Sequence, residues 1–144
     1  MHSDEGLRLV FPATLADARE VTELVTRLCG RMSADERALY ATAVMELLVN
    51  VVKHGYGNAA DATITISAVP GPDAIELIIE DTGIGMPAGR FDAAPAEVDF
   101  DAGDLSRLPE AGLGLAIVKS VMDTVQYRHD RGGNRLTAMR RWVR

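Results

Sequence analysis

Three polar residues, Glu46, Asn50 and His54, follow one another at intervals of four. In an α-helix this spacing stacks the side chains along one side. A carboxylate there can orient and deprotonate a hydroxyl group or a water, and an Asn carbonyl oxygen suits a hard cation such as Mg²⁺. An ordinary solvent-exposed helix face, with a C-terminal His that favours the helix dipole, explains the same spacing. The spacing alone leaves both interpretations open.

A second candidate is Asp81-Thr-Gly-Ile-Gly, which follows a predicted strand. The Asp81 carboxylate can accept a hydrogen bond from an amino group, and Gly83 and Gly85 let a flat ligand approach the backbone. A plain turn explains these residues almost as well. The segment is not a dinucleotide fingerprint, because Met86-Pro87 leads into an aperiodic stretch and not into a helix.

The third candidate is Gly112-Leu113-Gly114-Leu115, which opens a predicted helix. A helix N-terminus preceded by glycines presents backbone N–H groups and a positive dipole end, which suit a phosphate chain. Simple helix initiation after a loop is the alternative. The segment is not a P-loop, because Lys119 lies well inside the helix and the residue directly before it is not a glycine.

Five strands and three helices must position these groups. Residues 88–111 show no helix or strand period and hold six carboxylates, which indicates a lid or a binding loop. The expected fold class is an α+β two-layer sandwich, in which a mixed, mostly antiparallel sheet carries three helices on one face. Caps, periodicity and turn residues predict a strand at 7–11, helices at 14–32 and 33–54, strands at 63–67 and 74–80, a helix at 112–122, and strands at 125–129 and 135–143.

The second predicted helix is amphipathic. A 100° wheel places the polar line from Glu46 to His54 opposite an apolar face. That face comprises Ala41, Val44, Met45, Leu48, Val51 and Val52.

Composition narrows the possible functions. The 144 residues include 15 Lys+Arg and 21 Asp+Glu, a net charge of −6 without a basic run, which argues against nucleic-acid or membrane binding. The length fits one domain. The single cysteine, Cys29, and a charged N-terminus without an apolar stretch lead us to expect a soluble cytoplasmic protein.

Taken together and in this order, the three segments resemble the N, G1 and G2 boxes of the GHKL superfamily, which has the Bergerat ATP-binding fold. The sequence of residues 46–57 is most similar to the matching segment of the anti-sigma factor serine/threonine kinases. It reads Glu-Leu-Leu-Val-Asn-Val-Val-Lys-His-Gly-Tyr-Gly. The resemblance extends from about Leu7 to the C-terminus. It implies one ATP-binding kinase domain over residues 1–144, with an ATP lid at about 88–111.

The resemblance implies ATP and Mg²⁺ as cofactors and gives roles to the matching residues. Asp81 would accept a hydrogen bond from the adenine amino group, while Gly83 and Gly85 would let the base pack closely. Asn50 would coordinate Mg²⁺ that bridges the phosphates. The resemblance also places His54 among the nucleotide-binding residues.

The remaining roles concern the phosphates and the reaction. Residues 112–115, which are Gly112, Leu113, Gly114 and Leu115, would wrap the β- and γ-phosphates with backbone donors. Arg107 in the acidic segment is the candidate for a positive contact with the γ-phosphate, against the alternative of a solvated surface Arg. Glu46 would be the base that activates a serine hydroxyl for in-line attack on the γ-phosphate.

The resemblance also implies partners. The serine would belong to a STAS-type anti-anti-sigma protein, the second partner would be a sigma factor, and a homodimer is possible. Arg19 lies where family members contact their partners, although a plain surface Arg is the alternative. One departure concerns Asn134, which stands where the family often has Thr after a glycine, and we assign it no nucleotide contact.

Two other functions stay open at this level. A non-catalytic regulator would bind ATP, or have lost even that, and act only through protein contacts. The catalytic half of a histidine kinase is disfavoured, because we find no preceding helical pair with a phosphoacceptor His.

Overall fold

The computed structural model describes residues 6–55, 62–82, 110–130 and 133–143, and at 54–55, 110–114 and 130 it describes the backbone only. The elements in chain order are β1 (Leu7–Pro12), α1 (Leu15–Thr26), α2 (Ala34–Asn50), η1 (Val51–Gly55), β2 (Thr63–Pro70), β3 (Ala74–Asp81), α4 (Glu110–Val121), β4 (Thr124–Asp130) and β5 (Gly133–Arg141).

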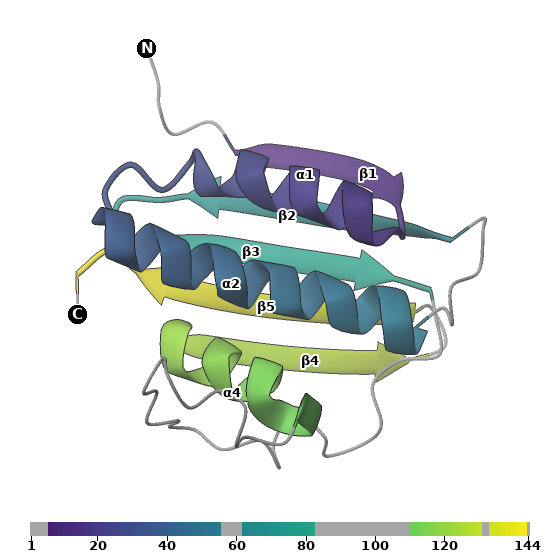
Figure 1. Cartoon of the computed structure of the whole chain (residues 1–144). Helices are drawn as coiled ribbons and strands as arrows, with labels where there is room; N and C mark the ends of the chain where they lie inside the picture. The colour runs from purple at the N-terminus through teal and green to yellow at the C-terminus, as the bar shows by residue number, and fades with distance from the viewer. Residues whose placement is uncertain (1–5, 56–61, 83–109, 131–132, 144) are drawn as a thin grey trace.

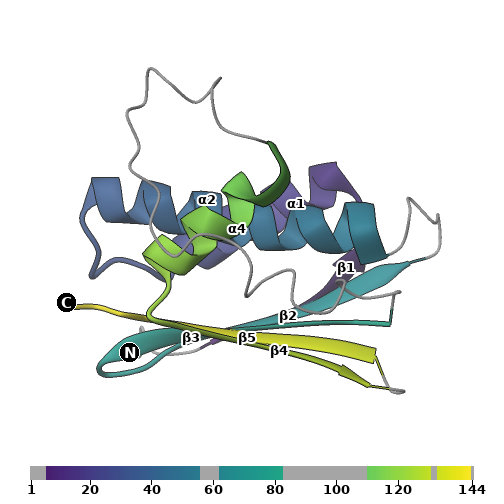
Figure 2. The same ribbon diagram turned by 90° about the horizontal axis from the view of Figure 1, so that it is seen from below.

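The strands form one sheet in the order β1-β2-β3-β5-β4, and each of its four pairings is antiparallel (Figure 1). The three α-helices lie on the same face of this sheet, and no described element covers the other face (Figure 2). The predicted α+β two-layer sandwich is therefore confirmed, with an antiparallel sheet in place of the expected mixed one.

The core lies between the sheet and the helices. Alternate residues of the strands face the helices, as the two-residue period of a strand requires, and they are buried. Ile and Leu dominate because branched side chains fit a pleated, half-buried surface. The fully buried apolar members on β2 and β3 are Ile64, Ile66, Ala68, Ile75, Leu77 and Ile79.

Helix α1 starts where the sequence predicts and ends earlier. The Thr14 hydroxyl accepts a hydrogen bond from the backbone N–H of Asp17, which makes Thr14 the N-cap. The predicted end at Met32 is wrong, because α1 stops at Thr26 and the backbone N–H groups of Leu28, Cys29 and Met32 bond to carbonyls three residues back. Leu28 and Cys29 still pack into or against the core from these tight turns, which is why their spacing resembled a longer helix.

Helix α2 has the predicted capping box between Ser33 and Glu36. Its α-helical part ends at Asn50, and the predicted last turn to Gly55 is the π-helical η1. The predicted buried face is partly wrong. Tyr40, Ala43 and Leu47 are buried, whereas Ala41, Met45 and Val51 are only half-buried.

The buried face of α2 is shifted because this helix packs against α1 on one flank and α4 on the other. Met45 lies on the flank towards α1, where its sulfur is 3.7 Å from the Thr22 hydroxyl oxygen. Glu46 and Asn50 therefore lie beside the buried face and not opposite it, and both are half-buried.

Helix α4 begins at Glu110, two residues before the predicted start. Gly112 therefore lies inside its first turn, and the predicted aperiodic segment ends at 109 and not at 111.

Opposite the end where α2 finishes, the C-terminal residues fasten the sheet to the helix layer. The Trp142 indole N–H donates to the carbonyl of Gly71, and the Arg31 guanidinium lies 5.6 Å from the ring centroid of Trp142. Arg31 also donates to the carbonyl of Pro72 at 2.7 Å. None of the helices among the described residues is long and apolar enough to cross a membrane.

Candidate nucleotide-binding site

The predicted site residues come from elements that finish at the same end of the molecule. In Figure 1, α2 and β3 run towards this end and α1 and α4 start on its side of the molecule, with the start of α4 set back beside β4. Strand pairing adds the start of β5, because Asp81 lies opposite Asn134. The fold thus brings together segments that are far apart in the sequence.

Helix α2 contributes Glu46 and Asn50. The Asn50 side-chain amide donates to the backbone carbonyl of Glu46 at 2.8 Å. This bond fixes the amide nitrogen against the helix, so the amide oxygen is the atom directed away from that carbonyl. On the helical wheel Asn50 lies on the flank opposite Met45, which is the flank towards α4. The amide oxygen of Asn50 is thus the atom left to coordinate a ligand.

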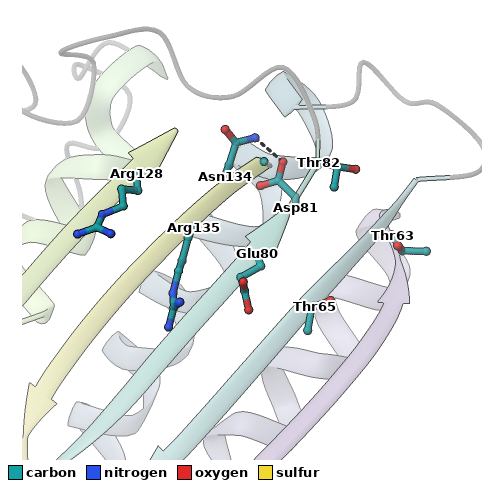
Figure 3. Close-up of a pocket in the computed structure, with 9 residues that line it drawn as sticks. Thr63, Thr65, Glu80, Asp81, Thr82, Arg128, Asn134 and Arg135 are labelled. Carbon is teal, nitrogen blue, oxygen red and sulfur yellow. Dashed lines mark hydrogen bonds between the residues drawn. The ribbon is translucent and has the colours of Figure 1, made fainter. Parts of the chain in front are cut away.

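Strand β3 contributes Asp81, its last residue. The Asp81 carboxylate accepts a hydrogen bond of 2.7 Å from the side-chain amide of Asn134, drawn as a dashed line in Figure 3. Asn134 is only 4% exposed. The sequence interpretation gave Asn134 no role, and the only signal was its place directly after Gly133 in the predicted hairpin.

Gly133 lets β5 approach β3 closely at this point. Its φ of +129° lies in a region that favours glycine. A Cβ atom at Gly133 would lie 2.5 Å from the backbone oxygen of Asp81. A glycine here is therefore a requirement of the backbone next to the candidate base-binding carboxylate.

Helix α4 contributes its first turn. The N–H groups of the N-cap and of the first three helical residues have no partner within an α-helix, and in α4 the described ones belong to residues 110–112. Gly112, Leu113 and Gly114 are described by their backbone alone, and the Leu115 side chain is 2% exposed. Backbone donors are thus the groups that this turn can offer to an anion.

Other predicted residues are not brought into the site by the described structure. Gly83, Gly85 and Arg107 lie outside the described residues, as does the predicted lid up to residue 109, and so does the side chain of His54. The predicted lid contains two arginines, Arg90 and Arg107, so Arg90 is a second candidate cation there. Arg19 is exposed on α1.

A hollow of about 390 Å³ reaches the same strand ends from the uncovered face of the sheet. Its charged walls include Glu80, Arg128 and Arg135, which alternate with the helix-facing residues of their strands (Figure 3). These residues lie on the opposite side of the sheet from Glu46 and Asn50. Asp81 and Asn134 also line the hollow, so it shares Asp81 with the site predicted from the sequence.

Among the described residues, no group of three or more His, Cys, Asp and Glu could hold a metal ion. One amide oxygen, that of Asn50, still suits Mg²⁺, because this ion is commonly held by one or two protein ligands together with substrate phosphates. This single protein ligand fits a metal ion that binds together with a nucleotide. The described residues do not provide a metal site made of protein ligands alone.

The histidine kinase-like ATPase domain family matches residues 11–140 of this chain. The chain belongs to this family. The mycobacterial sensor histidine kinase MprB has a similar fold, with a TM-score of 0.54 and 19% identity over 92% of this chain and 97% of that one.

The similar curated proteins specify the branch. A serine-protein kinase RsbW from Bacillus cereus (strain ATCC 10987 / NRS 248) is 30% identical over 92% of this chain and 82% of its own length. An anti-sigma F factor from Priestia megaterium is 32% identical over 74% of this chain and 68% of its own length. Within the ATPase-domain family, the chain thus falls in the branch of the anti-sigma factor serine-protein kinases, as its motifs predicted.

Proposed function

We propose that this protein is an anti-sigma factor with protein serine kinase activity. It would bind Mg-ATP, sequester a sigma factor and phosphorylate a STAS-type anti-anti-sigma protein on serine. One observation supports the proposal: the last part of α2, which carries Glu46 and Asn50, the end of β3, which carries Asp81, and the start of α4 lie towards the same end of the fold. Relatives named serine-protein kinase and anti-sigma factor support it.

In the proposed site each group has one task. Asp81 accepts a hydrogen bond from the adenine amino group, the first turn of α4 donates to the phosphates, and Asn50 offers its amide oxygen to Mg²⁺. The metal would neutralise charge on the phosphates when bound. Gly83, Gly85, His54 and Arg107 belong to this proposed site from the sequence alone.

Glu46 is the proposed catalytic base. It takes the proton of the serine hydroxyl, the serine oxygen forms a bond to the γ-phosphorus, and the bond from that phosphorus to the bridging oxygen of ADP breaks. The products are phosphoserine and ADP. The half-buried position of Glu46 beside Asn50 supports this assignment, because a base must be near the phosphates and reachable by the substrate.

The test combines labelled ATP, the protein and its cognate STAS partner. We expect phosphoserine, and a loss of about a hundredfold or more in transfer rate for Glu46→Gln, with ADP affinity nearly unchanged. Glu76→Gln is the matched control, because Glu76 is an exposed carboxylate on the sheet. Normal transfer by Glu46→Gln would remove Glu46 as the base. Loss of nucleotide binding in this variant would instead give Glu46 a structural role.

Asn50→Ala separates a nucleotide-dependent kinase from a regulator that acts only through protein contacts. A nucleotide site should lose Mg²⁺-dependent ADP affinity in calorimetry, whereas a pure adaptor should not respond. Arg19 is the proposed partner contact, because it is exposed in the first half of α1, and α1 starts on the side of the candidate site (Figure 1). Arg19→Ala should weaken partner binding while leaving ADP affinity unchanged.

A further inference from the structure

A chain of side-chain hydrogen bonds crosses three neighbouring strands beside Asp81. The Asn134 amide nitrogen donates to Asp81 Oδ1 at 2.7 Å. The Asn134 amide oxygen accepts from the Tyr127 hydroxyl at 3.1 Å and is in close contact with His129 Nδ1. Asn134 is thus bonded from both ends while it is almost fully buried.

The chemistry of these partners fixes the orientation of the Asn134 amide. Its oxygen faces the Tyr127 hydroxyl and His129 Nδ1, and its nitrogen faces a carboxylate that accepts. The reversed amide would turn its oxygen towards the Asp81 carboxylate, where two acceptors repel each other. His129 donates from Nδ1 in the imidazolium and in the neutral tautomer protonated there, so either form supports this orientation.

The strand register makes the chain possible. Asn134 on β5 lies directly opposite Asp81 on β3 and directly opposite His129 on β4. Tyr127 is two residues before His129 and therefore on the same side of β4. That side faces the helices, because Asn134 lies on the same face of β5 as the buried residues Leu136 and Ala138, two and four residues further along the strand. The chain therefore lies on the face of the sheet that carries Glu46 and Asn50.

We propose that Asn134, held by Tyr127 and His129, is a positioning residue that sets how Asp81 presents its carboxylate to the nucleotide base. This rests on the proposed function, in which Asp81 recognises the adenine amino group. A carboxylate has two oxygens, and a donor fixed to Oδ1 defines the directions in which the group accepts from a ligand. Strand β4 would thereby contribute to base selectivity through Asn134 and Asp81.

The readout is base selectivity, measured by calorimetry with ADP and with inosine diphosphate (IDP), which carries an oxo group in place of the adenine amino group. Asn134→Asp keeps the shape of the side chain and replaces its donor with an acceptor. We expect ADP affinity to fall about tenfold to a hundredfold while IDP affinity changes less than about threefold, so the preference for ADP collapses.

Two further variants keep the proposal testable if Asn134→Asp fails to fold. Tyr127→Phe removes one of the donors to the Asn134 oxygen and should lower the ADP preference by about twofold to fivefold. Asn134→Thr retains a hydroxyl donor and should keep more of the preference than Asn134→Asp. Arg128→Gln is the matched control, because Arg128 lies between Tyr127 and His129 but faces the other side of the sheet.

The outcomes separate the two proposals. An unchanged ratio of ADP to IDP affinity in the Asn134 and Tyr127 variants, with lower thermal stability, would overturn the positioning role and leave a purely structural bond. Binding of neither nucleotide by the wild-type protein would overturn the proposed function and this inference with it. Wild-type selectivity for ADP that is lost in these variants and kept in Arg128→Gln supports both.

Discussion

Arg140 on β5 allows a sharp test of how a buried charge affects this fold. Its side chain is 7% exposed, and Nη2 donates to Glu36 Oε2 at 2.9 Å. Nε and Nη1 are buried without a hydrogen-bond partner among the described residues. The other Glu36 oxygen accepts from the backbone N–H of Ser33 in the capping box. We compare Glu36→Gln, which retains an oxygen for the cap but loses the charge, with Arg140→Met, which removes the buried charge.

The two changes should have unequal effects. Removing one partner of a buried ion pair costs about 3–5 kcal/mol, and the 39% exposure of the Glu36 side chain places Glu36→Gln lower, at about 2–3 kcal/mol. Arg140→Met removes the guanidinium together with its two unbonded nitrogens, and an apolar side chain of similar length can fill the space. We expect the free energy of unfolding of Arg140→Met to lie within about 1 kcal/mol of wild type, or above it.

Urea unfolding followed by Trp142 fluorescence measures both variants. Trp142 is the only Trp in the chain and is 8% exposed, so unfolding should change its emission. Arg141→Met is the matched control, because Arg141 is exposed on the same strand, and it should change stability by less than about 0.5 kcal/mol. Equal losses for Arg140→Met and Glu36→Gln would refute the reasoning, since they would mean that the ion pair itself stabilises the fold.

Three further predictions concern single positions. The Tyr40 hydroxyl is buried without a hydrogen-bond partner in the described part of the chain, so Tyr40→Phe should leave thermal stability unchanged or raise it by about 1 kcal/mol. Burial raises the pKa of the Cys29 thiol from 9.0 to about 11 against the opposing effect of Arg37. The contribution of the protonated Cys29 thiol to stability should therefore be fully present below pH 9. The free energy of unfolding should fall as the pH rises towards 11, and it should fall less steeply in Cys29→Ala. Gly133→Ala should destabilise by about 1–3 kcal/mol in urea unfolding, since its Cβ would meet the Asp81 backbone.

Local signals predicted the elements well. The capping box at Ser33 and the cap at Thr14 fixed two helix starts, because each depends on residues within one turn. The extent of α1 and the buried face of α2 could not be predicted in the same way. Apolar residues after Thr26 pack from turns, and α2 has two helical neighbours that a wheel for one helix does not contain.

The candidate site shows the same division. Glu46, Asn50 and Asp81 were predicted because their spacing or place after a strand carries the signal. The hydrogen bonds of Asn134 could not be predicted, because Asp81, Tyr127 and His129 become its neighbours only when β3, β5 and β4 pair.

The pairing of Asn134 with both neighbouring strands ties the chemistry of this end to exact strand alignment. Sliding β5 by one residue would turn Asn134 to the uncovered face and bring Arg135 towards the helices. Sliding it by two would restore the face but displace the amide by about 7 Å. Insertions and deletions near these strands are therefore tolerated only where a turn absorbs them without changing the strand register. A designer who recombines these hairpins must transfer β3, β5 and β4 together.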